Sequence, residues 1–194
     1  MNNLLYKWNL YNLSLIPLYV IFILQYLKIE PILEWNTIRN INEYFARIFY
    51  ENWQVIFFIF MITLALLSYV IFKNDSNYGE KNPRKFKNIT AADFDHLTFL
   101  STYIIPLITF DLTEPRSFIV VIFLLLMIGT IYVKSNLYYL NPTLLLFGYK
   151  IYRAKSDDRS VILICKGKIT TIEKQLTYKN LGDNIYLIKE QECR

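Results

Sequence analysis

Four blocks of apolar residues recur along the chain, and charged stretches separate them. We place the blocks at about 8–27, 53–72, 97–113 and 118–134. An α-helix rises about 1.5 Å per residue, so about 20 residues cross the roughly 30 Å hydrocarbon core of a bilayer. The pattern therefore predicts an α-helical integral membrane protein with four transmembrane helices inside residues 1–135. We expect the third helix to begin near Ala91, ahead of its apolar block.

Composition and charge favour the same class and suggest an orientation. The chain is 54% hydrophobic and 19% charged, which is apolar for a soluble domain. With the N-terminus inside, the cytoplasmic segments hold 1, 5 and 11 of the 21 Lys and Arg residues, and the outer loops hold 3 and 1. Basic residues accumulate on the cytoplasmic side of membrane proteins. We therefore expect both termini to be cytoplasmic.

The first outer loop carries an amphipathic pattern over about 36–52. Apolar residues recur there at helical spacing, and four charged residues alternate in sign every four positions. These four form a candidate outer sensing surface: Arg39, Glu43, Arg47 and Glu51. Asn36 or Thr37 is the expected cap of this helix. The helix either lies flat on the outer membrane surface or continues into the second span.

The cytoplasmic segments divide into a basic loop, a short apolar segment and a polar module. The loop spans 73–96, and the segment 136–147 is too short to cross a bilayer, so it is expected to be membrane-proximal or re-entrant. Short strands separated by Gly and Asp turns are expected at Tyr149–Lys155, Ser160–Lys166 and Ile185–Lys189, which predicts a small, mostly β module over 148–194. Six cations are candidate contacts for a partner or for lipid: Arg84, Lys85, Lys87, Lys150, Arg153 and Lys155.

The sequence carries no recognisable catalytic motif. It lacks a glycine-rich phosphate loop, HExxH, CxxC and GxSxG, so we expect neither an enzyme nor a bound metal or cofactor. Cys165 and Cys193 fall in the expected cytoplasmic module, where thiols stay reduced.

A candidate kink and polar site lies in the third apolar block, at Tyr103, Pro106 and Asp111. Proline can break a transmembrane helix, and acids within spans often mark ion paths. A packing kink, with Asp111 as an interfacial carboxylate paired to Arg116 or Arg47, is the simpler interpretation.

Two segments resemble a known family. LSTYIIPLITFD (100–111) and LNPTLLLFGYKIYRA (140–154) are similar to the KwaA family, the membrane subunit of the Kiwa anti-phage defence system. The resemblance extends to chain size and to the small polar C-terminal segment.

This resemblance implies a non-enzymatic sensor in the bacterial inner membrane. Such a subunit would form a homo-oligomer, a tetramer by the family resemblance, and recruit a cytosolic DNA-binding partner, KwaB. Membrane lipid is the other expected partner, and the chain itself is not expected to bind nucleic acid. The alternative hypothesis is a small oligomeric channel or pore-forming effector, for which a polar stripe through the spans would be needed.

Overall fold

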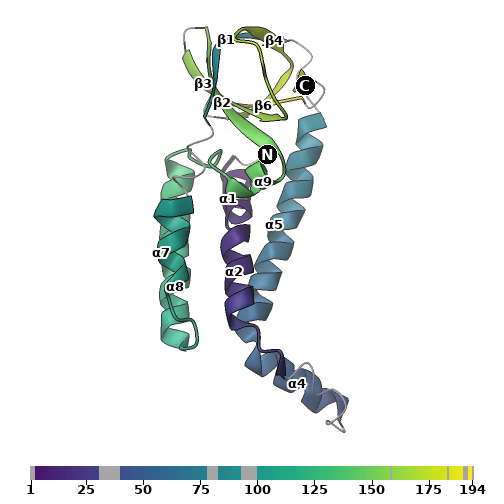
Figure 1. Ribbon diagram of the computed structural model, residues 1–194, viewed down its shortest axis with the longest axis vertical. Helices are drawn as coiled ribbons and strands as arrows, with labels where there is room; N and C mark the ends of the chain where they lie inside the picture. Colours follow the sequence, from purple (N-terminus) through teal and green to yellow (C-terminus); the bar gives the residue numbers. More distant parts are fainter. Residues whose placement is uncertain are drawn as a thin grey trace.

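The computed structural model places a group of apolar helices below a curved β-sheet (Figure 1). It describes residues 3–30, 40–77, 83–92, 100–157, 159–182, 184–189 and 192–193. The sheet lies beyond one end of the helices, and a short helix, α9 (Pro142–Leu146), lies where the two parts meet. The mostly β character predicted for the C-terminal module is therefore confirmed.

Within the described residues, two helices are long and apolar enough to cross a membrane, α5 (Trp53–Asn77) and α8 (Pro115–Lys134). The first predicted span consists of α1 (Asn3–Ser14) and α2 (Ile16–Tyr26), which are bent by 44° at their break and together count as a possible third span. That the chain has four spans, and that both termini are cytoplasmic, remain predictions.

The expected third span is only partly described. From Leu100 it contains a short π-helix, η2 (Leu100–Ile104), followed by α7 (Ile105–Ile108). Residues 93–99 lie outside the described part of the chain. Ala91, the expected start of this helix, is instead the last residue of a strand.

The break between α1 and α2 has a local cause. Pro17 has no backbone N–H, so the carbonyl of Leu13 loses its usual helical donor. The two preceding carbonyls also have altered partners at the break: the Ser14 hydroxyl donates to the Tyr11 carbonyl at 2.6 Å, and the Leu15 N–H donates to the Asn12 carbonyl at 3.2 Å. The apolar block is thus continuous in sequence but bent in space.

The sheet has six strands, in the order β4-β1-β2-β3-β6-β5. The predicted strands at Tyr149–Lys155, Ser160–Lys166 and Ile185–Lys189 are confirmed as β2 (Tyr149–Ser156), β3 (Arg159–Lys166) and β6 (Ile185–Ile188). Two short strands, β4 (Lys174–Leu176) and β5 (Tyr178–Gly182), complete the C-terminal part. Only β3 and β6 pair in parallel among the described strands.

The basic inner loop is more ordered than the sequence suggested. Residues Arg84–Ala91 form β1, which pairs with both β2 and β4. The loop predicted at 73–96 therefore supplies an interior strand of the sheet. Two of its cations, Lys85 and Lys87, are consequently held on the same surface as Arg153 and Lys155 of β2.

The two faces of the sheet belong to different cores. One face, with Phe86, Tyr152 and Leu163, encloses the interior of the β module. The other face contributes Tyr149 and Ile164 to a cluster that continues into the helices. The sheet is therefore docked on the helices through buried apolar contacts.

The expectation of two reduced thiols is wrong in this structure. Cys165 and Cys193 form a disulfide, with their Cα atoms 6.0 Å apart. The bond ties the C-terminal residues to β3. The backbone of Gly167 packs closely against that of Cys193. A Cβ added at Gly167 would lie 2.2 Å from the Cys193 carbonyl oxygen.

Replacing Gly129 with alanine is expected to separate α8 from α1. A Cβ at this position would lie 2.5 Å from a ring carbon of Tyr11 and 2.6 Å from one of Trp8. The Tyr11 hydroxyl is fixed by donation to the Leu125 carbonyl at 2.7 Å, so the ring cannot easily turn away. Overpacking of this kind costs about 1–3 kcal/mol. Thermal unfolding in detergent should show a lowered melting temperature, whereas Thr130→Ala, on the exposed side of α8, should not.

Candidate functional site

Four of the six predicted cations gather on the outward face of the paired strands β1 and β2. Lys87 lies directly opposite Lys155, and Arg153 lies opposite Thr90. Lys85 precedes Lys87 by two residues, and side chains two apart on a strand share a face. All four are exposed, so the pairing of two distant segments creates one basic face.

The opposed lysines are electrostatically unfavourable within the fold. Like charges directly across a strand pair destabilise a sheet by up to about 1 kcal/mol. Glu173 lies 3.2 Å from Lys85 and offsets that one cation of the face, and Asp157 forms an ion pair with Arg84. Neither of these two ion pairs involves Lys87 or Lys155. An external anionic surface or ligand is the kind of group that would relieve this repulsion.

The other two predicted cations lie apart from the basic face. Arg84 bonds Asp157, which raises the pKa of its guanidinium, and also donates to the Tyr186 hydroxyl at 3.2 Å. It therefore joins β1 to the β2–β3 turn and to β6. Lys150 alternates to the face of β2 that carries Tyr152, away from Arg153. The alternation of side chains along each strand distinguishes the outward-facing cations from those on the other face. The register between strands, however, could not be derived from the sequence.

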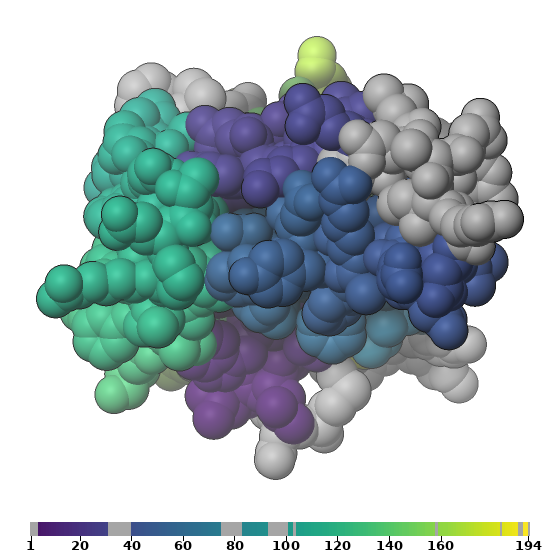
Figure 2. Space-filling view, turned by 90° about the horizontal axis from the view of Figure 1, so that it is seen from below, coloured from purple at the N-terminus to yellow at the C-terminus, as the bar shows by residue number. Residues whose placement is uncertain are grey.

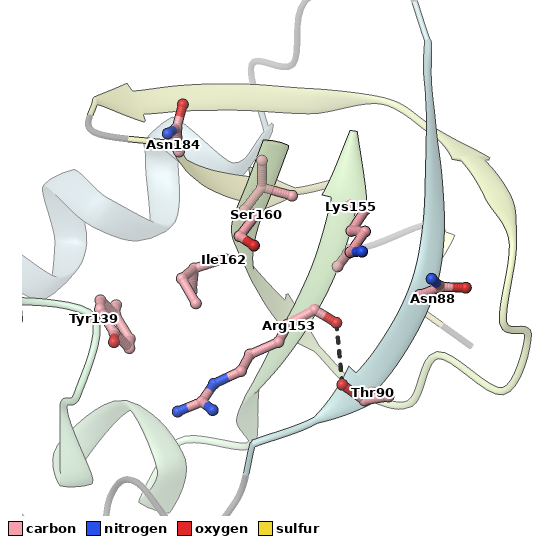
Figure 3. Close-up of a pocket in the computed structure, with 10 residues that line it drawn as sticks. Asn88, Thr90, Tyr139, Arg153, Lys155, Ser160, Ile162 and Asn184 are labelled. Atoms are coloured by element: carbon pink, nitrogen blue, oxygen red, sulfur yellow. Dashed lines mark hydrogen bonds between the residues drawn. The ribbon is translucent and has the colours of Figure 1, made fainter. Parts of the chain in front are cut away.

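A cavity of about 600 Å³ opens beside the basic face. Figure 3 shows the Arg153 side chain extending into it toward Tyr139, with Ser160 and Asn184 on other sides. A neighbouring hollow of about 460 Å³ includes Lys85, Lys87 and Lys155. Within the described residues, no cluster of three or more His, Cys, Asp or Glu could hold a metal ion.

The joint between helices and sheet centres on Asn141, which is fully buried. Its side-chain oxygen accepts from the N–H groups of Thr143 and Leu144 and so caps α9. Its side-chain NH2 donates to the Leu10 carbonyl of α1 at 2.9 Å. One side chain thus fixes the entry to β2 against the first helix. The order Asn-Pro at a helix start was a usable sequence signal for the cap, but the bond to α1 was not predictable.

Three further contacts reinforce the joint. The Lys7 ammonium donates to the side-chain oxygen of Asn136 at 2.7 Å, and the Tyr138 hydroxyl donates to the Gly182 carbonyl at 3.2 Å. The rings of Phe72 and Tyr149 lie 5.4 Å apart, which connects the end of α5 to the start of β2. Two hydrogen bonds and one aromatic contact thus connect the helices, the segment that follows α8 and the β module.

The outer helix is shorter than expected. It is α4 (Ile41–Glu51), capped by the side chain of Asn40 rather than by Asn36 or Thr37, which lie outside the described residues together with Arg39. Figure 2, seen from the end opposite the sheet, shows α4 extending sideways from the other helices. Arg47 and Glu51 form an ion pair at 2.9 Å, and Glu43 accepts from the Asn40 side chain at 3.3 Å.

The connection between α4 and α5 is hydrogen-bonded to the residues that follow the first predicted span. Asn52, almost fully buried, accepts from the Lys28 N–H at 2.8 Å and donates to the Lys28 carbonyl at 3.3 Å. α4 ends at Glu51 with Asn52 as its C-cap, and α5 begins at Trp53 with a change of direction. A displacement of α4 would be passed to the end of α2.

The candidate kink site contains no convergent chemistry in its described part. Pro106 lies near the start of α7, where its carbonyl accepts from the Thr109 hydroxyl at 2.7 Å. Asp111 accepts from the N–H and hydroxyl of Thr113 at 2.9 and 2.8 Å. The partner of Asp111 is thus Thr113, not the predicted arginine. The side chain of Tyr103 lies outside the described residues.

Substitution of Asn141 is expected to loosen the joint in two steps. Asn141→Ser keeps a capping oxygen but is too short to reach the Leu10 carbonyl, and Asn141→Ala loses both functions. A lost cap costs about 1 kcal/mol, and a buried carbonyl left without its donor costs about 1–3 kcal/mol. Trypsin cleavage at Lys134 and Lys150, which flank the joint, should accelerate from wild type to serine to alanine. Equal rates in all three proteins would contradict this role, and the exposed Asn74→Ala is the matched control.

Comparison with known proteins identifies the family. The family described as "Anti-phage protein KwaA" matches residues 6–187. The chain is also 26% identical over 142 residues to the Kiwa protein KwaA of Escherichia coli O55:H7 (strain RM12579 / EPEC), covering 71% of this chain and 72% of that protein. No solved structure matches. Since the family match extends over most of the sequence, the chain belongs to the KwaA family of anti-phage defence proteins.

Proposed function

We propose that this chain is a membrane-embedded, non-enzymatic sensor and scaffold subunit of an anti-phage defence complex. It resides in the bacterial inner membrane, with the β module on the cytoplasmic side. It assembles into a homo-oligomer, a tetramer in our proposal, and recruits a cytosolic DNA-binding protein resembling KwaB. The chain contributes membrane sensing and recruitment, and the partner contributes contact with nucleic acid.

The observation that carries this proposal is the continuous hydrophobic cluster between helices and sheet. It includes Phe22 of α2, Phe72 of α5, Tyr149 of β2 and Leu187 of β6. Tightly packed interiors transmit displacement because they contain little free volume. A movement of the helices would therefore shift the sheet rather than being absorbed between the two parts.

The outer end provides a starting point for such a movement. Exposed apolar residues on α4, including Ile41, Phe45 and Phe49, lie on a helix whose charged residues occupy another face. Helices of this type lie in the membrane interface and respond to lipid composition and curvature. Because Asn52 bonds the backbone of Lys28, a disturbance of α4 would reach α2 and then the joint at Asn141.

Polar groups between the helices support a scaffold rather than a channel. A crevice of about 310 Å³ contains Asn12, Tyr11 and Tyr19 among mostly apolar residues. The Asn12 side chain donates to the Met61 carbonyl at 3.3 Å, and the Tyr19 hydroxyl donates to the Asn12 side-chain oxygen at 2.8 Å. These groups are used to hold helices together. A pore would instead leave such groups facing water.

The basic face supplies the recruitment surface in this proposal. Lys85 and Lys87 are exposed on β1, and a positive surface steers acidic proteins toward it and sets the orientation of docking.

The side of the membrane that carries the β module is directly testable. A green fluorescent protein fused after Arg194 should fluoresce in living cells, since this protein matures in the cytoplasm but not when exported unfolded. A dark, full-length fusion would place the module outside. The disulfide between Cys165 and Cys193 gives this test weight, because such bonds persist mainly in oxidising compartments.

Charge reversal at Lys87 should weaken recruitment without weakening the fold. Because Lys87 faces Lys155, the Lys87→Glu variant replaces a repulsive pair by an attractive one. Capture of a KwaB-like protein by the tagged, detergent-solubilised chain should fall severalfold, with a matching loss of protection in plaque assays. Lys168→Glu, an equally large charge change at another exposed site, should retain both. Unchanged capture by Lys87→Glu would remove the basic face from the proposal.

A further inference from the structure

The cavity beside the basic face has the chemistry of an anion site. Its lining includes two cations, Arg153 and Lys155, and the side chains of Thr90, Ser160 and Asn184 supply hydroxyl or amide groups. None of the residues that line it in the described structure is acidic. Arginine forms paired hydrogen bonds to phosphate oxygens, and hydroxyl and amide groups complete such shells.

The walls of this cavity are held by the backbone rather than by flexible loops. The register of β1 and β2 shifts between Lys87 and Thr90, and Asn88, within that bulge, has a φ of 53°. Thr90 donates through its hydroxyl to the Arg153 carbonyl at 3.4 Å. On the opposite wall, Asn184 has a φ of 62° and accepts from the Ile162 N–H at 2.9 Å. Bulges are often found where a strand re-aims side chains toward a site.

The position of the cavity relative to the helices narrows the choice of ligand. Tyr139, which forms one wall, follows the last residue of α8, Lys134, by only five positions. With α8 crossing the bilayer as proposed, the opening would lie where this helix leaves the hydrocarbon layer, at the level of the lipid phosphates. Ile162 and Val161 add apolar surface to the same lining. A volume of about 600 Å³ exceeds what a bare phosphate needs and suits a phosphate with an attached glycerol.

We propose that this cavity binds a phosphate group, held by Arg153 and Lys155, and that its natural source is the headgroup of an anionic phospholipid. A bound headgroup would tie the outer face of the sheet to the membrane surface and offset the repulsion between Lys87 and Lys155. The inference goes beyond recruitment of a partner. It depends on the proposed function only in placing the β module beside the bilayer.

The test uses the full-length chain in lipid nanodiscs. Nanodiscs contain phosphatidylcholine alone or with added phosphatidylglycerol, and lipid retained after gentle detergent release is identified by native mass spectrometry. The wild-type chain should retain phosphatidylglycerol. Arg153→Gln should retain severalfold less, and Arg153→Lys should be intermediate because it keeps the charge but loses the paired hydrogen bonds.

A matched control is available in the same hairpin. Arg159→Gln removes one positive charge from an exposed residue of β3 that does not line the cavity, and it should retain lipid as the wild type does. If Arg153→Gln fails to fold, Ser160→Asp, at an exposed position in the lining, places a repelling carboxylate in the cavity with little change in volume. Equal retention by wild type, Arg153→Gln and Ser160→Asp would overturn the proposal.

A second arm separates the two sources of phosphate. Inorganic phosphate and glycerol phosphate are titrated against the chain in phosphatidylcholine nanodiscs, with thermal stability as the readout. Stabilisation of the wild type but not of Arg153→Gln, without lipid retention, would assign the cavity to a soluble phosphate. No response in either arm refutes the site. Capture of the KwaB-like partner is measured on the same variants, so lost lipid with retained capture is distinguished from failure of the proposed function.

Discussion

The requirement that buried polar groups find partners decides how the two parts of this protein meet. Asn141 is fully buried, and both polar groups of its side chain are hydrogen-bonded: the oxygen caps α9, and the NH2 group donates to the Leu10 carbonyl. A buried amide without such partners would cost several kcal/mol in an apolar surrounding. The first turn of α9 and the middle of the bent first span are thereby fixed to each other. β2 begins eight residues after Asn141, so this bond helps to fix the position of the sheet relative to the helices.

Elements with strong local patterns were predictable, and those that depend on long-range pairing were not. The second and fourth apolar blocks and strands β2, β3 and β6 have clear hydrophobic patterns, and the structure confirms them. β1 has few apolar residues: only Phe86 and Ile89 of its eight residues are buried, and the bulge interrupts their alternation. Its identity as a strand comes from pairing with β2 and β4, which no local pattern records.

The candidate site shows the same division. A run of cations was visible in the sequence, but which of them share a surface depended on strand register. Lys85, Lys87, Arg153 and Lys155 face outward together, whereas Arg84 is used inside the module by Asp157 and Tyr186. The Asn-Pro pair at Asn141 indicates a turn, but neither the burial of Asn141 nor its contact with α1 can be derived from neighbouring residues.

The placement of functions along β2 follows from the alternation of a strand. Tyr149 is buried in the cluster shared with the helices, and four and six residues farther on, Arg153 and Lys155 share its face of the strand but lie in the open cavity. β2 pairs with β3 over eight consecutive residue pairs, so its backbone is held along its whole length. A helix movement that displaces Tyr149 must also displace Arg153 relative to the bilayer surface. If the cavity binds phosphate as we propose, bound phosphate and helix position would be mechanically linked, and lipid in the cavity would bias the equilibrium of any transition that the helices undergo.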